Sequence, residues 1–308
     1  MRKIWWFLGM LASMGILMIL FWRSSQNSVL SSTKVTNKIA LTEKTIRYER
    51  RVLKQGEAHI IFVPSQSDFL VTPAVSQNLE TLETFARKYQ AIATINGGFF
   101  DPKNQKTTSN IVLQGKLVAN PRENERLANN PDLQSYLNQI FNRTEFRRYA
   151  CNTALGENSK ANSTARYDIA FHNDPLPVGC QLVDALGGGP KLLPDLTLVQ
   201  EGFVDEAKSR DALGSTQLNA RSAVGITRDG TIILVTISQQ PKASLSGISL
   251  PALADFMKSL GAEKAMNLDG GSSSSLYYNG KTFFGKFDSE GNFVKRPVKS
   301  VLLVRKKS

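Results

Sequence analysis

Two short segments of this sequence combine glycines with polar side chains that could take part in chemistry. They are Asn96-Gly97-Gly98-Phe99-Phe100-Asp101 and Asn267-Leu268-Asp269-Gly270-Gly271-Ser272, called here the first and the second glycine tip. Glycine lets backbone N–H groups approach a ligand closely, and catalytic groups are commonly carried on loops that rigid elements support. Taken alone, each tip is also typical of a tight turn without a ligand.

Each tip is expected to follow a helix and then a buried strand. Before the first tip, apolar residues recur at helical spacing from Leu79 to Tyr89, and Ala91–Ile95 forms a short apolar run. Before the second tip, Ser249 can cap a helix that Gly261 ends, and Ala265–Leu268 is the following strand. The apolar face of that helix is formed by Leu253, Phe256, Met257 and Leu260.

Hairpins are expected elsewhere. Ser222–Thr227 and Thr231–Ile237 are apolar runs joined through Asp229-Gly230, a dipeptide that favours a type I′ turn, and Asn279-Gly280 predicts a second hairpin. The run His59–Val63 and a last strand at Val301–Val304 complete the pattern. The sequence thus predicts an α/β (α+β) domain whose mixed sheet contains antiparallel hairpins and carries packed helices.

Four motifs in order resemble the phosphodiester glycosidase domain family over roughly Ile92 to Arg305. They are Asn96-Gly97-Gly98-Phe99-Phe100, Gly187-Gly188-Gly189-Pro190, Arg221-Ser222-Ala223-Val224-Gly225 and Asn267-Leu268-Asp269-Gly270-Gly271-Ser272-Ser273. The resemblance implies hydrolysis of a sugar 1-phosphodiester, with release of the sugar from the phosphate. The leaving group of such a substrate is a phosphate ester of low basicity, so one carboxylate can suffice without a general acid.

The resemblance also implies roles for named residues. Asp269 is the candidate base, nucleophile or stabiliser of positive charge on the sugar, and Arg221 would hold the phosphate through its planar fork of donors. The alternatives are an Asx turn for Asp269 and a structural ion pair for Arg221. The candidate substrate-binding residues, which would contact sugar hydroxyls or phosphate oxygens, are Asn96, Gly97, Gly98, Gly188, Gly189, Ser222, Asn267, Gly270, Gly271 and Ser272.

This sequence departs from the family pattern at two places. The alternatives to the activity implied by the resemblance are therefore a substrate of different shape or a non-catalytic glycan-binding module. Relatives often carry Asp-Gly-Arg after the strand equivalent to Ile232–Ile237, where this chain has Ser238-Gln239-Gln240. They also often read Gly-Gly-Gly-Ser where this chain has Gly-Gly-Ser-Ser. One charged contact is therefore missing or supplied elsewhere.

The N-terminus predicts export. Ile4–Trp22 is an uncharged, mostly apolar segment that, as a helix, would span the hydrocarbon core, and Arg2 and Lys3 before it place the N-terminus in the cytoplasm. A membrane anchor in residues 1–23 is favoured over a cleaved signal segment, followed by a linker in 24–45 and one domain in 46–308. Residues 121–150, rich in Asn, Arg, Glu and Gln, are expected to form an insertion on the outside of the core.

The remaining side-chain inventory excludes several classes of site. The cysteines, Cys151 and Cys180, predict one disulfide in an exported chain, although two free thiols are the alternative. The histidines, His59 and His172, show no zinc-ligand spacing with them, so no metal site or cofactor is predicted, while a divalent cation stays open. Ser272–Ser275 has no partner His and Asp pattern of a serine hydrolase.

The net charge of +12 suggests attraction to anionic headgroups or envelope polymers, because a nucleic-acid partner conflicts with export. The expected partners are therefore a sugar-phosphodiester or envelope glycan substrate and the membrane. The domain is expected on the extracytoplasmic side, periplasmic or extracellular.

Overall fold

The computed structural model describes residues 45–151, 164–243 and 245–307, all within the unit that spans Glu43–Ser308. The predicted anchor, Ile4–Trp22, and residues 24–44 of the predicted linker lie outside the described residues. Among the residues that are described, no helix is long and apolar enough to cross a membrane.

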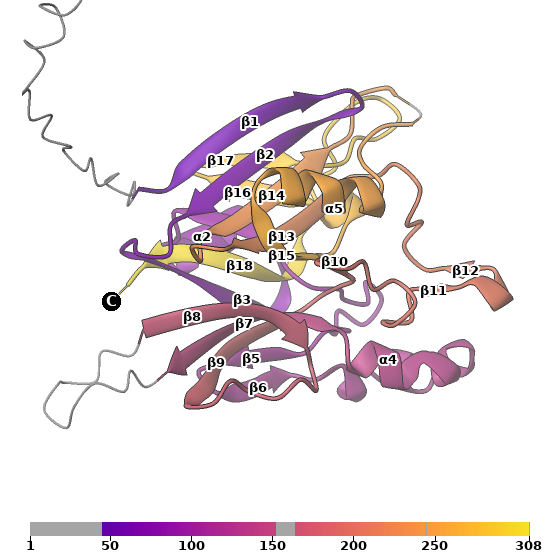
Figure 1. Ribbon diagram of the computed structural model, residues 1–308. Coiled ribbons are helices and arrows are strands. Elements are labelled where there is room, and N and C mark those ends of the chain that lie inside the picture. The colour runs from indigo at the N-terminus through magenta and orange to yellow at the C-terminus, as the bar shows by residue number, and fades with distance from the viewer. Residues whose placement is uncertain (1–44, 152–163, 244, 308) are drawn as a thin grey trace, which may run out of the picture. The chain divides into compact units, whose positions relative to one another are not determined.

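Three larger antiparallel sheets dominate the described part of the chain (Figure 1). The first has the order β1 (Arg47–Leu53), β2 (Gly56–Val63), β14 (Ile232–Ser238), β13 (Arg221–Thr227), β15 (Ala262–Asn267) and β10 (Lys191–Leu193). The second has the order β17 (Lys281–Phe284), β16 (Ser275–Tyr278), β4 (Ala93–Asn96), β18 (Val298–Lys306) and β3 (Phe69–Glu80).

The third sheet has the order β6 (Lys116–Ala119), β5 (Ile111–Leu113), β9 (Cys180–Gly187), β7 (Thr144–Cys151) and β8 (Thr164–Phe171). A small ribbon pairs β11 (Val204–Asp205) with β12 (Arg210–Asp211). The predicted antiparallel hairpins are confirmed, in a fold that is rich in sheet and has few helices.

The two predicted amphipathic helices are α2 (Leu82–Lys88) and α5 (Leu250–Ser259). Ser249 caps α5 as predicted, its Oγ accepting a hydrogen bond from the N–H of Ala252. Gly261 follows at φ +90°, a left-handed conformation that suits the end of a helix. The shorter helical segments are η1 (Pro121–Glu123), α3 (Glu125–Ala128), η2 (Pro131–Tyr136), α4 (Leu137–Phe141), η3 (Glu206–Lys208) and η4 (Gly271–Ser273).

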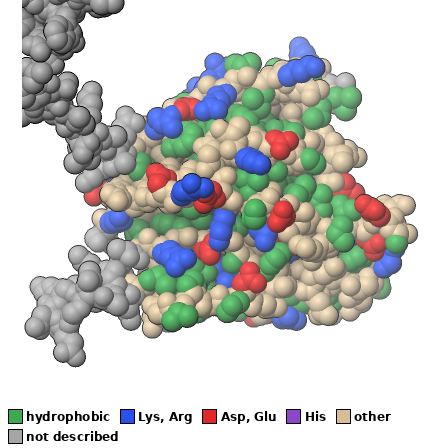
Figure 2. All heavy atoms as spheres, in the orientation of Figure 1, with side chains coloured by type: hydrophobic (Ala, Val, Ile, Leu, Met, Phe, Trp, Pro, Cys, Tyr) green, Lys and Arg blue, Asp and Glu red, His purple; other side chains and the backbone are tan. Residues whose placement is uncertain are grey.

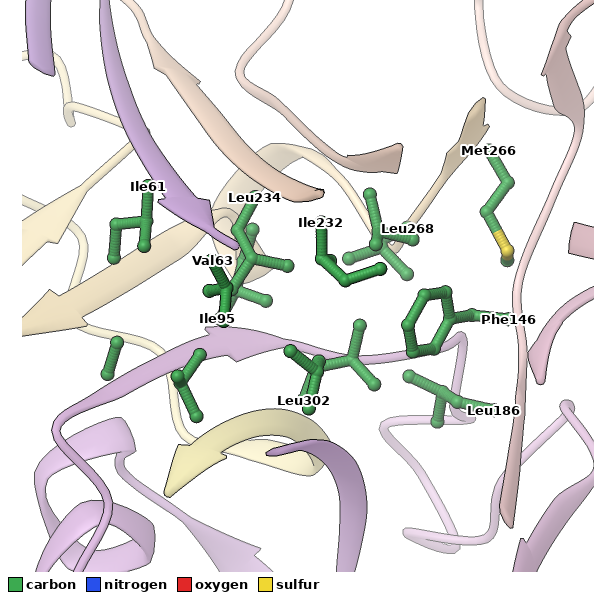
Figure 3. Close-up of a cluster of buried hydrophobic side chains, with 14 of the residues drawn as sticks. Ile61, Val63, Ile95, Phe146, Leu186, Ile232, Leu234, Met266, Leu268 and Leu302 are labelled. Atoms are coloured by element: carbon green, nitrogen blue, oxygen red, sulfur yellow. The ribbon is translucent and has the colours of Figure 1, made fainter. Parts of the chain in front are cut away.

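One apolar core joins the three larger sheets (Figure 3). Ile61 of β2 and Leu234 of β14 meet Ile95 of β4, while Phe146 of β7 and Leu186 of β9 come from the third sheet. Alternate residues of β2 and β14 face a second core, which α5 covers. β14, in the middle of the first sheet, is therefore buried on both faces, which explains why it is a nearly continuous apolar run, whereas the edge strand β1 is largely exposed.

The two predicted hairpin turns differ in their geometry. Asn279 and Gly280 both have positive φ, at 47° and 86°, as a type I′ turn requires. At Asp229-Gly230 only Gly230 does, at 82°, so the hairpin exists but the prediction of a type I′ turn was wrong there. The Asp229 side chain instead accepts a hydrogen bond from the N–H of Thr231 at 3.2 Å, which stabilises a longer turn.

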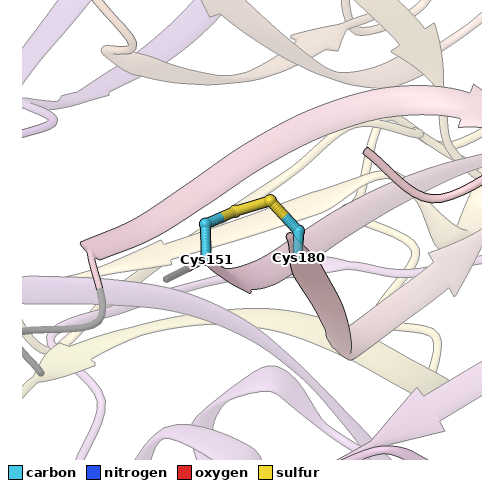
Figure 4. The surroundings of a disulfide bond; sticks show 2 residues. All are labelled: Cys151 and Cys180. Atoms are coloured by element: carbon cyan, nitrogen blue, oxygen red, sulfur yellow. A yellow bond between two sulfur atoms is a disulfide. The ribbon is translucent and has the colours of Figure 1, made fainter. Parts of the chain in front are cut away.

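Residues 121–150 contain two kinds of structure. Residues 121–142 hold short helical segments, with a local cluster of Leu127, Tyr136, Ile140 and Phe141. From Thr144 the chain forms β7, a strand bonded on both sides in the third sheet. Cys151 at the end of β7 pairs with Cys180 of β9, and the two form the predicted disulfide (Figure 4).

Basic side chains on the face shown in Figure 2 are interspersed with acidic ones. Ion pairs on the described surface include Arg228 with Glu263 and Lys106 with Glu125, whose side chains are largely exposed. The positive charge on this face is therefore distributed rather than gathered in one patch.

Candidate active site

The two glycine tips are hydrogen-bonded to each other. The side-chain Nδ2 of Asn96 donates to the carbonyl oxygen of Asp269 at 2.6 Å, and the N–H of Asp269 donates to the carbonyl of Gly97 at 3.0 Å. The Oδ1 of Asn96 accepts from the N–H of Ser275 at 3.1 Å. Asn96 is fully buried, so its amide joins the two tips instead of contacting a ligand as predicted.

Glycine is required at the junction of the three sheets because the backbones approach each other closely. A Cβ on Gly98 would lie 2.1 Å from the carbonyl oxygen of Gly187, and a Cβ on Gly97 would lie 2.5 Å from the Oγ of Ser300. A Cβ on Gly188 would lie 2.9 Å from the carbonyl of Asn267. The motifs of β4, β9 and β15 are thus brought together by tight backbone packing.

Most glycine N–H groups that were predicted to bind a ligand donate to protein oxygens. The donors and acceptors are Gly97 to Ser300, Gly188 to Thr144, Gly189 to Asn267, Gly271 to Ala220, and Gly270 to the Oδ1 of Asp269. These five N–H groups are therefore already engaged by protein oxygens, and the role of these glycines in substrate binding stays a prediction.

Asn267 differs from Asn96 in its hydrogen bonding. Its Nδ2 donates to the carbonyl of Gly189 at 2.9 Å, but its buried Oδ1 has no hydrogen-bond partner among the described residues. Ser222 of β13, the strand that pairs with β15, is also buried, and its Oγ lies 3.2 Å from the Oγ1 of Thr236. Ser222 therefore packs within the sheet, whereas Asn267 keeps an unused acceptor beside the second tip.

Asp269 is the acidic side chain at the centre of this junction. It is partly exposed to solvent, but protein atoms crowd its carboxylate, and this burial raises the pKa of Asp269 to about 6. Hydrogen bonds from Ser273 and from the N–H of Gly270, and the positive charge of Arg296, oppose the rise in the pKa. A carboxyl group with such a pKa can exchange a proton near neutral pH.

Arg221 lies beside the second tip but is largely engaged by the protein. Its Nη2 donates to the carbonyls of Leu213 and Gly214 at 3.1 and 2.8 Å, and its Nε lies 3.5 Å from the carbonyl of Ile248. Burial lowers the pKa of Arg221 below its usual value. Its Nη1 lies 3.8 Å from the position of a Cβ on Gly270, so one nitrogen, not the predicted fork, faces the tip.

Arg296 is a functional candidate that the sequence did not reveal. Its Nη1 donates to the Oγ of Ser272 at 3.1 Å, its guanidinium lies 5.4 Å from the centre of the Phe100 ring, and its charge acts on Asp269. Arg296 therefore contacts both tips and is partly exposed. No local pattern marks it, because it stands among other basic residues just before β18, and only the pairing of β18 with β4 brings it here.

Arg143 approaches the first tip near Phe99. Its guanidinium lies 5.9 Å from the centre of the Phe99 ring and 3.7 Å from that of Phe203, and its Nε donates to the carbonyl of Glu201 at 3.2 Å. Burial lowers the pKa of Arg143 to about 9. It is a second arginine near a tip that the motifs did not include.

The other polar residues considered in the sequence have partners of their own. His172 lies 2.6 Å from the Oε1 of buried Glu145, and Asp101 accepts from the N–H of Lys103 and pairs with Arg126. No group of three or more His, Cys, Asp or Glu side chains that could hold a metal ion occurs within the described ranges.

Comparisons with solved structures show the fold. The zebrafish N-acetylglucosamine-1-phosphodiester alpha-N-acetylglucosaminidase catalytic domain, auto-inhibited by its pro-peptide, is 19% identical with a TM-score of 0.58, over 85% of this chain and 83% of that one. A hypothetical protein from Synechocystis is 20% identical with a TM-score of 0.56, over 85% of this chain and 62% of that one. Comparison of the sequence with curated proteins finds no match.

The family comparison covers the chain from the residue after α2 into β18. Residues 89–305 match the model of the phosphodiester glycosidase family, in agreement with the range expected from the motifs. This match includes both glycine tips and Arg296, and it extends over more than half of the sequence. The chain therefore belongs to the phosphodiester glycosidase family.

Proposed function

We propose that this chain hydrolyses a sugar 1-phosphodiester by breaking the bond between the anomeric carbon and the bridging oxygen. Water supplies the oxygen that joins the sugar, and the bonding electrons leave with the phosphate monoester. Because that leaving group is weakly basic, it departs without a proton from a general acid. This requirement fits a site with one central carboxylate, which is the observation that carries the proposal.

Asp269 is proposed as the reacting carboxylate. It can accept a proton from the attacking water, attack the anomeric carbon itself, or stabilise positive charge on the sugar ring. Its environment supports the first role in particular, because a base with a pKa of about 6 is largely ionised at neutral pH yet still able to take up a proton.

Arg296 is proposed as the residue that holds the phosphate. Its guanidinium is beside Ser272 and close enough to act on the charge of Asp269, so a phosphate next to the anomeric carbon would lie within its reach. Arg296 would then supply the charged contact that the sequence Ser238-Gln239-Gln240 lacks. Arg221 would contribute one nitrogen beside Gly270 and keep the loop of Leu213 and Gly214 in place.

The direct test is turnover of a panel of sugar 1-phosphodiesters by the full chain and by two variants. Asp269→Asn should lower turnover by at least about a hundredfold, because the amide removes charge and basicity with little change in volume. Asp195→Asn is the matched control, since Asp195 is exposed. Full activity in Asp269→Asn would remove the catalytic role of Asp269, and binding of the panel without turnover in the unmodified chain would favour a glycan-binding module.

We further propose that the substrate is an envelope glycan or glycolipid on the extracytoplasmic side of a membrane. Two observations support this location. The sequence of residues 4–22 has the length and apolarity of a membrane anchor, and the Cys151–Cys180 disulfide is of a kind that persists in oxidising compartments.

A further inference from the structure

An aromatic-lined cavity of about 780 Å³ lies between the β1–β2 hairpin, the end of β14 and the β16–β17 hairpin. Figure 1 shows β17 beside β1 and β2. Ring side chains from Tyr48, His59, Phe283, Phe284, Phe287 and Phe293 line it. Cavities of this size commonly hold small ligands, and Asp269 is not among the residues that line this one.

The rings form two groups that present flat faces. His59 stacks on Phe283 with ring centres 4.1 Å apart, and Tyr48 stacks on Phe283 at 5.4 Å. In the second group, Phe287 and Phe293 have ring centres 4.6 Å apart, and Phe293 is 51% exposed. A half-exposed phenylalanine at the edge of a ring-lined cavity is an apolar surface without a partner in the described structure.

The polar groups of the cavity are mostly uncharged or already paired. Gln239 and Gln240 each donate through Nε2 to a backbone carbonyl, of Ser246 and Lys54 respectively, and no partner of either Oε1 occurs among the described residues. Glu57 pairs with Arg50 and lies 3.1 Å from His59, and burial lowers the pKa of His59 to about 4, which keeps that ring neutral.

Lys281 is the charged group that remains. Its Nζ lies 5.0 Å from the centre of the Phe283 ring, and no carboxylate pairs with it in the part of the chain that the structure describes. The cavity thus offers flat rings, amide oxygens and one ammonium group. Sugar rings match this set, because their C–H faces stack on aromatic rings while their hydroxyls donate to amide oxygens. A fatty chain would leave the amides and the ammonium unused.

Backbone hydrogen bonds through Gly285 connect Gln239, which lines the cavity, to Ser274, which lies next to the second tip. The N–H of Gln239 donates to the carbonyl of Gly285 at 2.8 Å, and the N–H of Gly285 donates to the carbonyl of Ser274 at 2.7 Å. Ser274 directly follows η4 of the second tip. Phe293 at the cavity edge is three residues before Arg296, a span of at most about 10 Å.

We infer that this cavity binds a sugar chain that is attached to the phosphate of the substrate, on the side opposite the sugar that is released. The substrate is then a phosphodiester whose phosphate carries an oligosaccharide. This inference rests on the proposed function. Two of its lining residues, Tyr48 and His59, lie outside residues 89–305, the range of the family match. Lys281 would contact an anionic group of the sugar chain.

Calorimetric binding to the full chain separates this inference from the proposed activity. The probes are cellotriose, chitotriose and maltotriose, each also as its phosphomonoester, with dodecyl phosphate as the apolar alternative. At least one trisaccharide should bind, and Phe293→Ala should weaken that binding about tenfold through loss of a stacking face. Lys281→Gln should weaken only the phosphorylated form, and Val178→Ala, at a fully exposed site, should change neither.

Binding of dodecyl phosphate alone, or of no probe, would overturn the sugar-binding assignment whether or not the chain has hydrolytic activity. If sugars bind but no phosphodiester is hydrolysed, the cavity assignment holds and the catalytic proposal fails. If hydrolysis occurs, Phe293→Ala should reduce the preference in kcat/KM for a trisaccharide-bearing diester over a methyl diester by about tenfold. An unchanged preference would show that the cavity does not serve the reaction.

Discussion

At the scale of single residues, the pKa of Asp269 is set by burial, which raises it, and by nearby hydrogen-bond donors and positive charge, which lower it. Burial disfavours the charged form, while Ser273, the N–H of Gly270 and Arg296 favour it, and the balance leaves the pKa at about 6. A free aspartate would have lost its proton two pH units lower, at about 4. Asp269 therefore changes its charge in a range where both forms are accessible to catalysis.

The pH dependence of activity follows from this pKa. If the ionised carboxylate reacts, kcat/KM should rise with pH and reach a plateau with a midpoint near the pKa of about 6. A rate profile measured on one phosphodiester, in buffers of constant ionic strength, gives the midpoint. A midpoint near 4 would mean that the carboxylate is well solvated.

The same pKa predicts a pH-dependent stability difference for Asp269→Asn. Because the folded pKa lies above the unfolded value, the folded state binds the proton more tightly, and ionisation lowers the free energy of unfolding as pH rises from about 4 to 6. The asparagine variant lacks this loss, so its stability relative to the unmodified chain should increase across that window. Urea unfolding at several pH values measures the difference, and a difference that does not change with pH would contradict it.

The two arginines near the second tip should respond differently to substitution. Arg296→Gln should raise KM at least about tenfold. Arg296→Lys should raise KM less than Arg296→Gln does, since the lysine keeps the charge but not the planar fork. Arg221→Lys should mainly lower the unfolding midpoint, because the carbonyls of Leu213 and Gly214 lose their donor. Arg228→Gln, at a side chain that is 91% exposed, is the control. A larger KM effect at Arg221 than at Arg296 would reverse these assignments.

At the scale of elements, the helices and hairpins could be predicted from local patterns. Ser249 and Gly261 mark the ends of α5, and Asn279-Gly280 adopts the predicted turn, because capping and turn preferences depend on neighbouring residues. The turn at Asp229-Gly230 could not be distinguished in the same way, since the dipeptide is compatible with more than one hairpin loop.

The contact between the two glycine tips depends on Asn96, whose amide hydrogen-bonds to Asp269 and Ser275. Asn96→Ala should lower the free energy of unfolding by about 2 kcal/mol, because it leaves a buried carbonyl and a buried N–H without partners. Asn173→Ala, at an exposed position, should stay within about 0.5 kcal/mol of the unmodified chain. Equal stability of the two variants in chemical unfolding would show that Asn96 does not join the tips.

At the scale of the whole described unit, the three-sheet arrangement explains what the sequence could not predict. The tips do not meet as strand ends do in an open α/β sheet; they meet because β4, β9 and β15 belong to three antiparallel sheets that share one core. Pairings such as β18 with β4 join segments about two hundred residues apart, and no local pattern encodes them. Arg296 was missed for this reason.

The proposed extracytoplasmic location is tested by protease accessibility. Protease is added to cells that are bounded by an intact inner membrane. It should degrade the domain, because the anchor is expected to leave the domain on the exported side. Thiol labelling of the denatured, unreduced protein should find neither Cys151 nor Cys180 free, in agreement with their disulfide. Protection of the domain together with two labelled thiols would contradict export.

The central claim is that the bond broken is the one between the sugar and the bridging oxygen. Hydrolysis in water enriched in the heavy oxygen isotope distinguishes this from cleavage at phosphorus, because the new oxygen stays with the atom that was attacked. Mass spectrometry of the released phosphate monoester should find no heavy oxygen, since water attacks the anomeric carbon. Heavy oxygen in the phosphate would show attack at phosphorus and contradict the assignment as a glycosidase.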